Sequence, residues 1–99
     1  MSKLKSSPKV VRVSRQLGSQ VKRSRLARKL PQDLIAERAR ISLSTLKRIE
    51  NGDPTVAMGS YLMVLLSLGI LPEALSINDD LGEELLQMDA RERAPRSKK

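Results

Sequence analysis

Residues 30–52 read LPQDLIAERARISLSTLKRIENG and predict two short helices joined by a tight turn. Pro31 suits a first helical turn because it has no amide hydrogen to leave unpaired, and Asp33 interacts favourably there with the helix dipole. Ser42 is placed to cap the second helix, and Asn51-Gly52 is typical of a helix end. We therefore expect one helix from Pro31 to about Ala39 and another from Leu43 to Glu50.

The flanking sequence predicts further short helices. From Gln16, the spacing of Leu17, Val21 and Leu26 or Ala27 indicates a buried stripe on a helix that ends near Arg28 or Lys29. A fourth helix is predicted over about Met58–Leu68, stopping at Gly69, with one possible further turn over Pro72–Leu75. We expect residues 16–76 to form an all-α bundle of four or five short helices.

The two ends have different compositions. Residues 1–15 are rich in Lys, Arg and Ser and contain Pro8, which predicts a flexible basic arm; a short strand through Val10, Val11 and Val13 is the alternative. Residues 77–99 begin as an acidic amphipathic segment. In it, a last helix is predicted to start at Asn78–Asp80 and end near Arg91, before a disordered basic tail.

Composition excludes several classes of active site. The chain has no Cys, His, Trp or Phe, so thiol nucleophiles, imidazole bases, disulfides and Cys/His zinc sites are not available. The acidic pairs Asp79/Asp80 and Glu83/Glu84 offer a metal or acid–base site only in principle, because adjacent helical residues point to different faces and no third ligand is near. We expect a solvated acidic segment, no metal or other cofactor, and no enzymatic activity.

The charge favours an anionic partner. The net charge is +8, and it divides into +11 over residues 1–50 and −3 over residues 51–99. Single-stranded RNA is usually stacked on aromatic side chains, of which Tyr61 is the only one, so duplex DNA fits better. No apolar run approaches the roughly 20 residues of a membrane span, and the lack of Cys is compatible with a reducing cytoplasm.

Two short helices with a tight turn and a polar second helix are what a helix-turn-helix needs to reach into a major groove. Residues 30–39 and 41–52 resemble the lambda-repressor-like, Xre-type family, through Gln32, Ala36, Ser42 and the run Ile49-Glu50-Asn51-Gly52. The resemblance covers about Leu17–Ile70. It implies a dimer that binds a palindromic double-stranded DNA operator in the bacterial cytoplasm, associated with the nucleoid when bound.

Candidate contacts follow from the family positions and from the chemistry of each side chain. Arg48 can form two hydrogen bonds to a guanine edge, Ser44 offers an adaptable hydroxyl, and Leu43 can touch a thymine methyl group. For Arg48 and Lys47, phosphate contact or simple solvation is the alternative. The predicted base contacts are Gln32, Leu43, Ser44, Lys47 and Arg48, and the predicted phosphate contacts are Arg25, Ser42, Thr45 and Asn51.

The remaining candidates have structural alternatives. Ser42 can act only as a cap, Thr45 as a packed surface residue, Asn51 as a helix end and Gln32 as a solvated helix start. Arg25 and Glu50 occupy the family positions of an ion pair between the first helix and the end of the third. On the arm, Lys9, Arg12 and Arg15 can follow the duplex or remain solvated.

Three residues depart from the family pattern. Arg40 stands where Gly is preferred, Pro31 replaces a Thr or Ser cap, and Leu34 stands where a polar residue is common. A left-handed backbone at Arg40 costs on the order of 1 kcal/mol. Leu34 either contacts another protein or is packed by the first helix.

A second resemblance concerns residues 52–61 and 68–71, which look like the HipB branch of the family. It implies an autoregulating antitoxin of a type II toxin-antitoxin system, bound to a HipA-like kinase toxin or its split components. Two alternatives remain: an interaction module that mainly restrains the kinase, and a stand-alone phage-type repressor. The acidic segment, with Leu81, Leu85, Leu86 and Met88, is a candidate docking helix for a partner protein.

Overall fold

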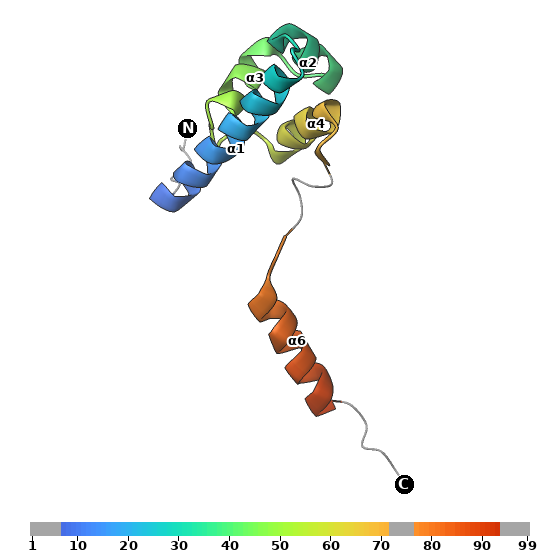
Figure 1. The fold of residues 1–99 in the computed structure, drawn as a ribbon. Coiled ribbons are helices and arrows are strands. Elements are labelled where there is room, and N and C mark those ends of the chain that lie inside the picture. The colour runs from blue at the N-terminus through green and yellow to red at the C-terminus, as the bar shows by residue number, and fades with distance from the viewer. Residues whose placement is uncertain (1–6, 72–76, 94–99) are drawn as a thin grey trace.

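The computed structural model describes residues 7–71 and 77–93, which form five α-helices and no strand (Figure 1). The all-α prediction is confirmed. Within the described ranges, no helix is both long and apolar enough to cross a membrane. The helices are α1 (Pro8–Ala27), α2 (Gln32–Ala39), α3 (Leu43–Glu50), α4 (Met58–Leu68) and α6 (Asp80–Arg93).

The predicted boundaries of α2, α3 and α4 are confirmed, because strong local signals set them. Ser42 Oγ accepts a hydrogen bond from the Thr45 amide at 3.0 Å, which caps α3. Gly52 and Gly69 both take positive φ, 78° in each case, immediately beyond α3 and α4. The turn predicted over residues 72–75 and the tail from residue 94 lie outside the described residues.

The prediction of a flexible arm over residues 8–15, and its alternative of a strand through the valines, are wrong. The α1 helix begins at Pro8, eight residues earlier than predicted, because Ser7 Oγ accepts a hydrogen bond from the Val10 amide at 3.1 Å and Pro8 occupies the first turn. The first half of α1 also packs against the loop after α3. A Cβ built on Gly52 would lie 2.8 Å from Arg15 N and 2.9 Å from Ser14 O.

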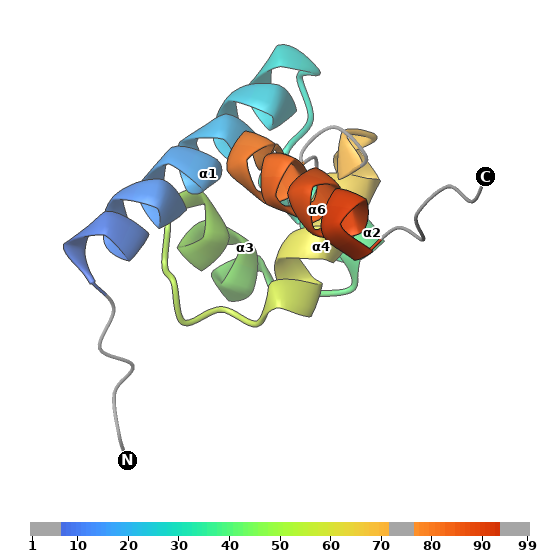
Figure 2. The ribbon, with the colours of Figure 1, turned by 90° about the horizontal axis from the view of Figure 1, so that it is seen from below.

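Helices α1 and α3 cross at a glycine. A Cβ built on Gly18 would lie 2.8 Å from Gly52 N and 2.9 Å from Glu50 O, so a side chain at this position would force the helices apart. Figures 1 and 2 show α1 running along α3, with α2 and α4 completing the bundle. The close crossing fixes the orientation of α3 against the basic helix α1.

The core lies between these four helices. Its fully buried side chains come from every one of them, and they include Val21, Ile35, Leu46, Ile49 and Val64. Each of these burials stabilises the fold by about 1.5 to 3 kcal/mol relative to exposure. Tyr61, at the edge of the core, donates its hydroxyl hydrogen to the Asp53 carbonyl at 2.8 Å.

The departures from the family pattern have clear structural outcomes. Arg40 is left-handed, with φ 58° and ψ 42°, as anticipated for a position that prefers Gly. Pro31 precedes α2 without any side-chain cap, and Leu34 is half-buried.

Helix α6 is acidic at its start, as predicted, and ends at Arg93 rather than Arg91. It has no buried residue and stands away from the bundle (Figure 1).

Candidate nucleic-acid interface

The exposed face of α3 is the one the helical spacing predicts. Leu46, Ile49 and Glu50 are buried, whereas Leu43, Ser44, Lys47 and Arg48 face solvent. The two hydroxyls at the start of the helix are paired, since Ser42 Oγ donates to Thr45 Oγ1 at 2.9 Å. Capping is therefore the observed role of Ser42, and the phosphate contacts of Ser42 and Thr45 stay predictions.

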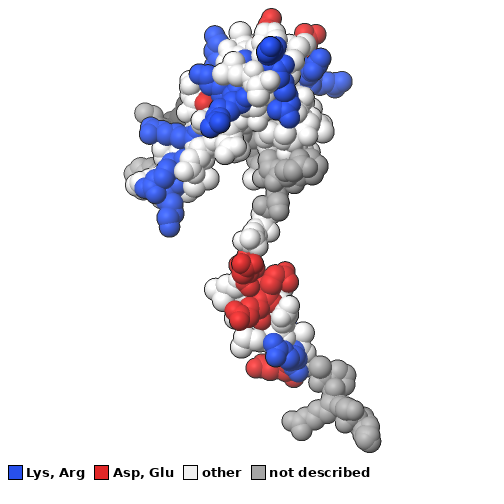
Figure 3. All heavy atoms as spheres, in the orientation of Figure 1, with Lys and Arg blue, Asp and Glu red and all other residues white. Residues whose placement is uncertain are grey.

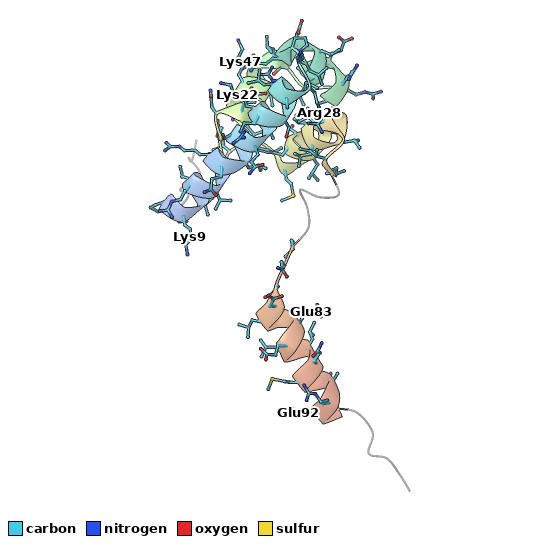
Figure 4. All side chains as sticks on the ribbon, viewed as in Figure 1. Lys9, Lys22, Arg28, Lys47, Glu83 and Glu92 are labelled. Atoms are coloured by element: carbon cyan, nitrogen blue, oxygen red, sulfur yellow. The ribbon has the colours of Figure 1, made fainter. Side chains whose placement is uncertain are left out.

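Next to this face, three helices contribute to one depression of about 230 Å³. Lys22 enters from α1, Gln32 from the start of α2, and Lys47 with Asn51 from α3, above the carboxylate of Glu50. Figure 4 shows Lys22 and Lys47 close together at one end of the bundle, far from Lys9. Two ammonium groups beside two amide side chains form a site suited to a phosphate oxygen.

Lys22 is a site residue that the sequence reasoning missed. It lies one turn after Gly18, where α1 crosses α3, and three residues before Arg25, which bonds to α3. Residues three or four apart share a helix face, so this spacing directs Lys22 toward α3. The spacing of Gly18, Lys22 and Arg25 is present in the sequence, but it indicates a site residue only when the crossing of α1 and α3 at Gly18 is known.

Beneath the depression lies the predicted ion pair, which is confirmed. Arg25 Nε and Nη2 donate to Glu50 Oε2 and Oε1 at 2.7 Å and 3.1 Å, and Arg25 Nη1 donates to the Leu30 carbonyl at 2.8 Å. The two side chains are only 8% and 3% exposed. The pair joins α1, the start of α2 and the end of α3, so it orients the exposed face of α3.

Burial changes the roles of two predicted contact residues. Arg25 directs its guanidinium inward, so the structure does not offer it to a phosphate as predicted. Gln32 Nε2 donates to Glu50 Oε1 at 3.0 Å, which ties the Gln32 amide to the buried pair while its side chain still lines the depression. The second Nε2 hydrogen and Oε1 of Gln32 make no hydrogen bond with the described residues and are left for a base or phosphate contact.

Arg48 also differs from its predicted arrangement. Its Nε donates to Asp53 Oδ2 at 2.9 Å and its Nη2 donates to Thr55 Oγ1 at 2.9 Å. The guanidinium is half-exposed, but it is held against the loop after α3. A base contact through Nε requires Arg48 to leave Asp53, whereas Nη1 makes no hydrogen bond with the described residues.

The loop that holds Arg48 is itself well ordered by hydrogen bonds. Asp53 Oδ1 accepts from the Thr55 hydroxyl at 2.6 Å and from the Thr55 amide at 2.8 Å. These bonds, followed by the one from Arg48, lower the pKa of Asp53 from 3.8 to about 2. The run Asp53-Pro54-Thr55 is typical of an Asx turn. It does not predict that the Arg48 side chain bonds to this turn.

Basic side chains surround this region. Helix α1 carries six Lys or Arg residues and no Asp or Glu. Figure 3 shows the basic side chains spread over the bundle on the face viewed, and most acidic ones gathered on α6. The exposed face of α3 therefore lies in a positive field.

A sequence profile described as "Helix-turn-helix domain" matches residues 16–67, just over half of the chain. The chain belongs to this helix-turn-helix family. The match begins inside α1 and ends one residue before the end of α4, so it covers the bundle. Comparisons with curated proteins and with solved structures found no match.

In this helix-turn-helix domain, α2 and α3 are the two helices of the motif, and Arg40, Ile41 and Ser42 form the turn between them. The second helix of such a motif is the one that reads base edges in a major groove about 12 Å wide. That helix is α3, and its polar face is exposed as the motif requires.

Proposed function

We propose that this chain is a sequence-specific, double-stranded DNA-binding transcriptional repressor. The observation that carries the proposal is the convergence of Lys22, Gln32, Lys47 and Asn51 beside the exposed face of α3. Phosphate contacts beside a recognition helix set its register in the groove, and the helix then meets the base edges. Repression follows from occupation of the promoter, and no reaction is catalysed.

The contacts divide into two groups. We assign Lys22, Lys47 and Asn51 to phosphates, because they line the depression beside α3. They do not lie in the first turn of α3, which is assigned to the bases. Leu43 and Ser44, exposed in the first turn of α3, are assigned to base edges. Arg48 joins this second group, either through Nη1 or after Nε is released from Asp53.

Duplex DNA is favoured over single-stranded nucleic acid. Binding of unpaired bases relies on aromatic platforms, and the only aromatic side chain of the chain, Tyr61, is buried with its hydroxyl bonded to Asp53. A basic surface without exposed aromatic rings instead suits the regular phosphate spacing of a duplex.

The finer proposal is a homodimer on a palindromic operator, located in the bacterial cytoplasm. Two copies related by a two-fold axis would place their α3 helices in half-sites about 34 to 36 Å apart. The likeness of residues 52–61 and 68–71 to the HipB branch supports an antitoxin that represses its own operon and binds a HipA-like kinase. Inhibition of such a kinase by the purified chain, in the absence of DNA, tests this part separately.

Selection of bound duplexes from a random pool tests the function itself. The selected duplex is expected to bind at least 100-fold more tightly than random duplex, with affinity falling steeply as salt rises. Lys47→Ala is expected to weaken binding several-fold, whereas Arg23→Ala, an equal loss of charge on the far face of α1, is expected to have a smaller effect. Equal binding of selected and random duplexes would refute the proposal.

A further inference from the structure

Helix α6 exposes an apolar stripe on which no residue of the described ranges 7–71 and 77–93 is closely packed. Leu81, Leu85 and Met88 follow the spacing i, i+4, i+7, which places them on one face of the helix, and they are 64%, 54% and 49% exposed. None of the 14 residues of α6 is buried. An isolated helix of about this length is only marginally stable in water. Packing of its apolar face on another surface would stabilise it.

Helix α1 exposes a stripe of matching length. Val10 and Val13, in the first half of α1, are 49% and 56% exposed. With Leu17, which is half-buried against the core, they follow the spacing i, i+3, i+7. The stripe continues into a groove of about 280 Å³ between α1 and α4, lined by Leu65 and Ile70 among others. The α1 stripe and this groove together offer an apolar track for a helix.

The charges of the two helices are complementary. Helix α1 carries six basic residues and no acidic one, whereas α6 carries five acidic residues and two basic ones. Helical spacing places Glu84 and Asp89 on either side of the α6 stripe. On α1, Lys9 borders the apolar stripe. The separation of charge between the bundle and α6 is visible in Figure 3.

We propose that α6 of one copy docks on the stripe formed by Val10, Val13 and Leu17 of a second copy, and that this reciprocal exchange forms the homodimer. In the single chain, α6 stands away from α1, and both apolar surfaces remain exposed (Figure 1). Exchange covers both stripes in both copies and closes the assembly with two-fold symmetry. The inference deepens the proposed function, which requires a dimer, but it is tested without DNA.

The first measurement is the mass of the full chain by light scattering over a range of concentrations. The wild-type mass is expected to approach twice the 11.0 kDa of one chain. Leu85→Asp is expected to raise the dimer dissociation constant at least tenfold, because it places a charge in the centre of the stripe. Leu86→Asp is the matched control: the neighbouring leucine is 65% exposed but lies off the stripe, so the mass is expected to remain unchanged.

A mixture of two variants identifies the exchange. Val13→Asp disrupts only the α1 stripe, and Leu85→Asp disrupts only the α6 stripe. In a dimer of either variant alone both interfaces are disrupted, so each variant is expected to be mostly monomeric. In a mixed dimer, the intact α6 of the Val13→Asp chain can dock on the intact α1 stripe of the Leu85→Asp chain. An equimolar mixture is therefore expected to form dimers in part. Circular dichroism verifies that both variants keep the helical fold, and Val10→Asp replaces Val13→Asp if the latter does not.

Several results would overturn the exchange. The helix exchange would be rejected if the wild-type chain were a monomer. In such a monomer, protection of the α6 amides from exchange with solvent would show that α6 docks within its own chain. Equal effects of Leu85→Asp and Leu86→Asp, or no restoration in the mixture, would also reject it. Specific binding of a single half-site can still be measured with a monomer, so the repressor proposal fails or survives independently.

Discussion

Arg48 on the recognition helix is bonded to Asp53 in the following loop, with Arg48 Nε 2.9 Å from Asp53 Oδ2. The same arginine is the side chain of α3 best suited to recognise guanine. The free protein therefore holds Arg48 Nε and one Nη2 hydrogen in internal hydrogen bonds, and we expect a base edge to compete with Asp53 and Thr55 for them.

Removal of the Asp53 charge is expected to favour DNA binding. Asp53→Asn keeps an oxygen for Thr55 but weakens the pair with Arg48, and a surface pair contributes about 0 to 1 kcal/mol. Operator affinity in a binding titration is thus expected to rise by up to about fivefold. In the Arg48→Ala background, which should itself lose preference at one operator base, only the general gain from one lost negative charge should remain. An equally large gain in that background would reject the competition.

The pair also predicts a pH dependence of stability. The pKa of Asp53 is about 2 in the folded chain against an ordinary 3.8, so its charged form stabilises the fold above pH 4. This contribution is expected to decline as pH falls from 4 to 2. Urea unfolding of the wild type and of Asp53→Asn should show a stability difference that shrinks over this interval. A difference independent of pH would exclude Asp53 as its source.

The buried pair Arg25–Glu50 is expected to stabilise the orientation of α3 strongly. Arg25→Met leaves Glu50 charged and buried, which typically costs about 3 to 5 kcal/mol. The double variant Arg25→Met/Glu50→Leu should recover much of that loss in chemical denaturation. Glu37→Gln, which removes an exposed charge from α2, is the control and should leave stability nearly unchanged. A small effect of Arg25→Met would contradict this role.

Two glycines in helices provide a matched test of packing. Gly18→Ala is expected to destabilise the chain by about 1 to 3 kcal/mol, because the methyl group meets the backbone of α3 and of the following loop. Gly59→Ala, with nothing within 4 Å of its Cβ, is expected to stabilise it by up to about 1 kcal/mol. Thermal unfolding measures both. Similar shifts for the two variants would mean that the α1–α3 crossing is not tight.

Local signals explain why α2, α3 and α4 could be predicted from the sequence. The Ser42 cap and the glycines at 52 and 69 fix the ends of helices through hydrogen bonds and backbone conformations within a few residues. The start of α1 was missed for a related reason. The Lys, Arg and Ser content together with Pro8 favours a flexible arm, although Pro8 after Ser7 is a typical first-turn residue.

The candidate site was less predictable, because it depends on contacts between elements. The spacing of α3 gave its exposed face, and the family pattern gave the Arg25–Glu50 pair. The inward direction of Arg25, the bond from Gln32 to Glu50 and the contribution of Lys22 all depend on how α1 and α2 approach α3. No periodicity within a single helix contains that information.

The most direct test follows the backbone amide resonances of the isotope-labelled chain while the selected duplex is added. The largest shifts are predicted on α3, at the start of α2 and around Lys22, with little change at Arg12 and Arg23 on the far face of α1. Shifts centred on Arg12 and Arg23 instead, with α3 unaffected, would contradict the account of α3 as the recognition helix.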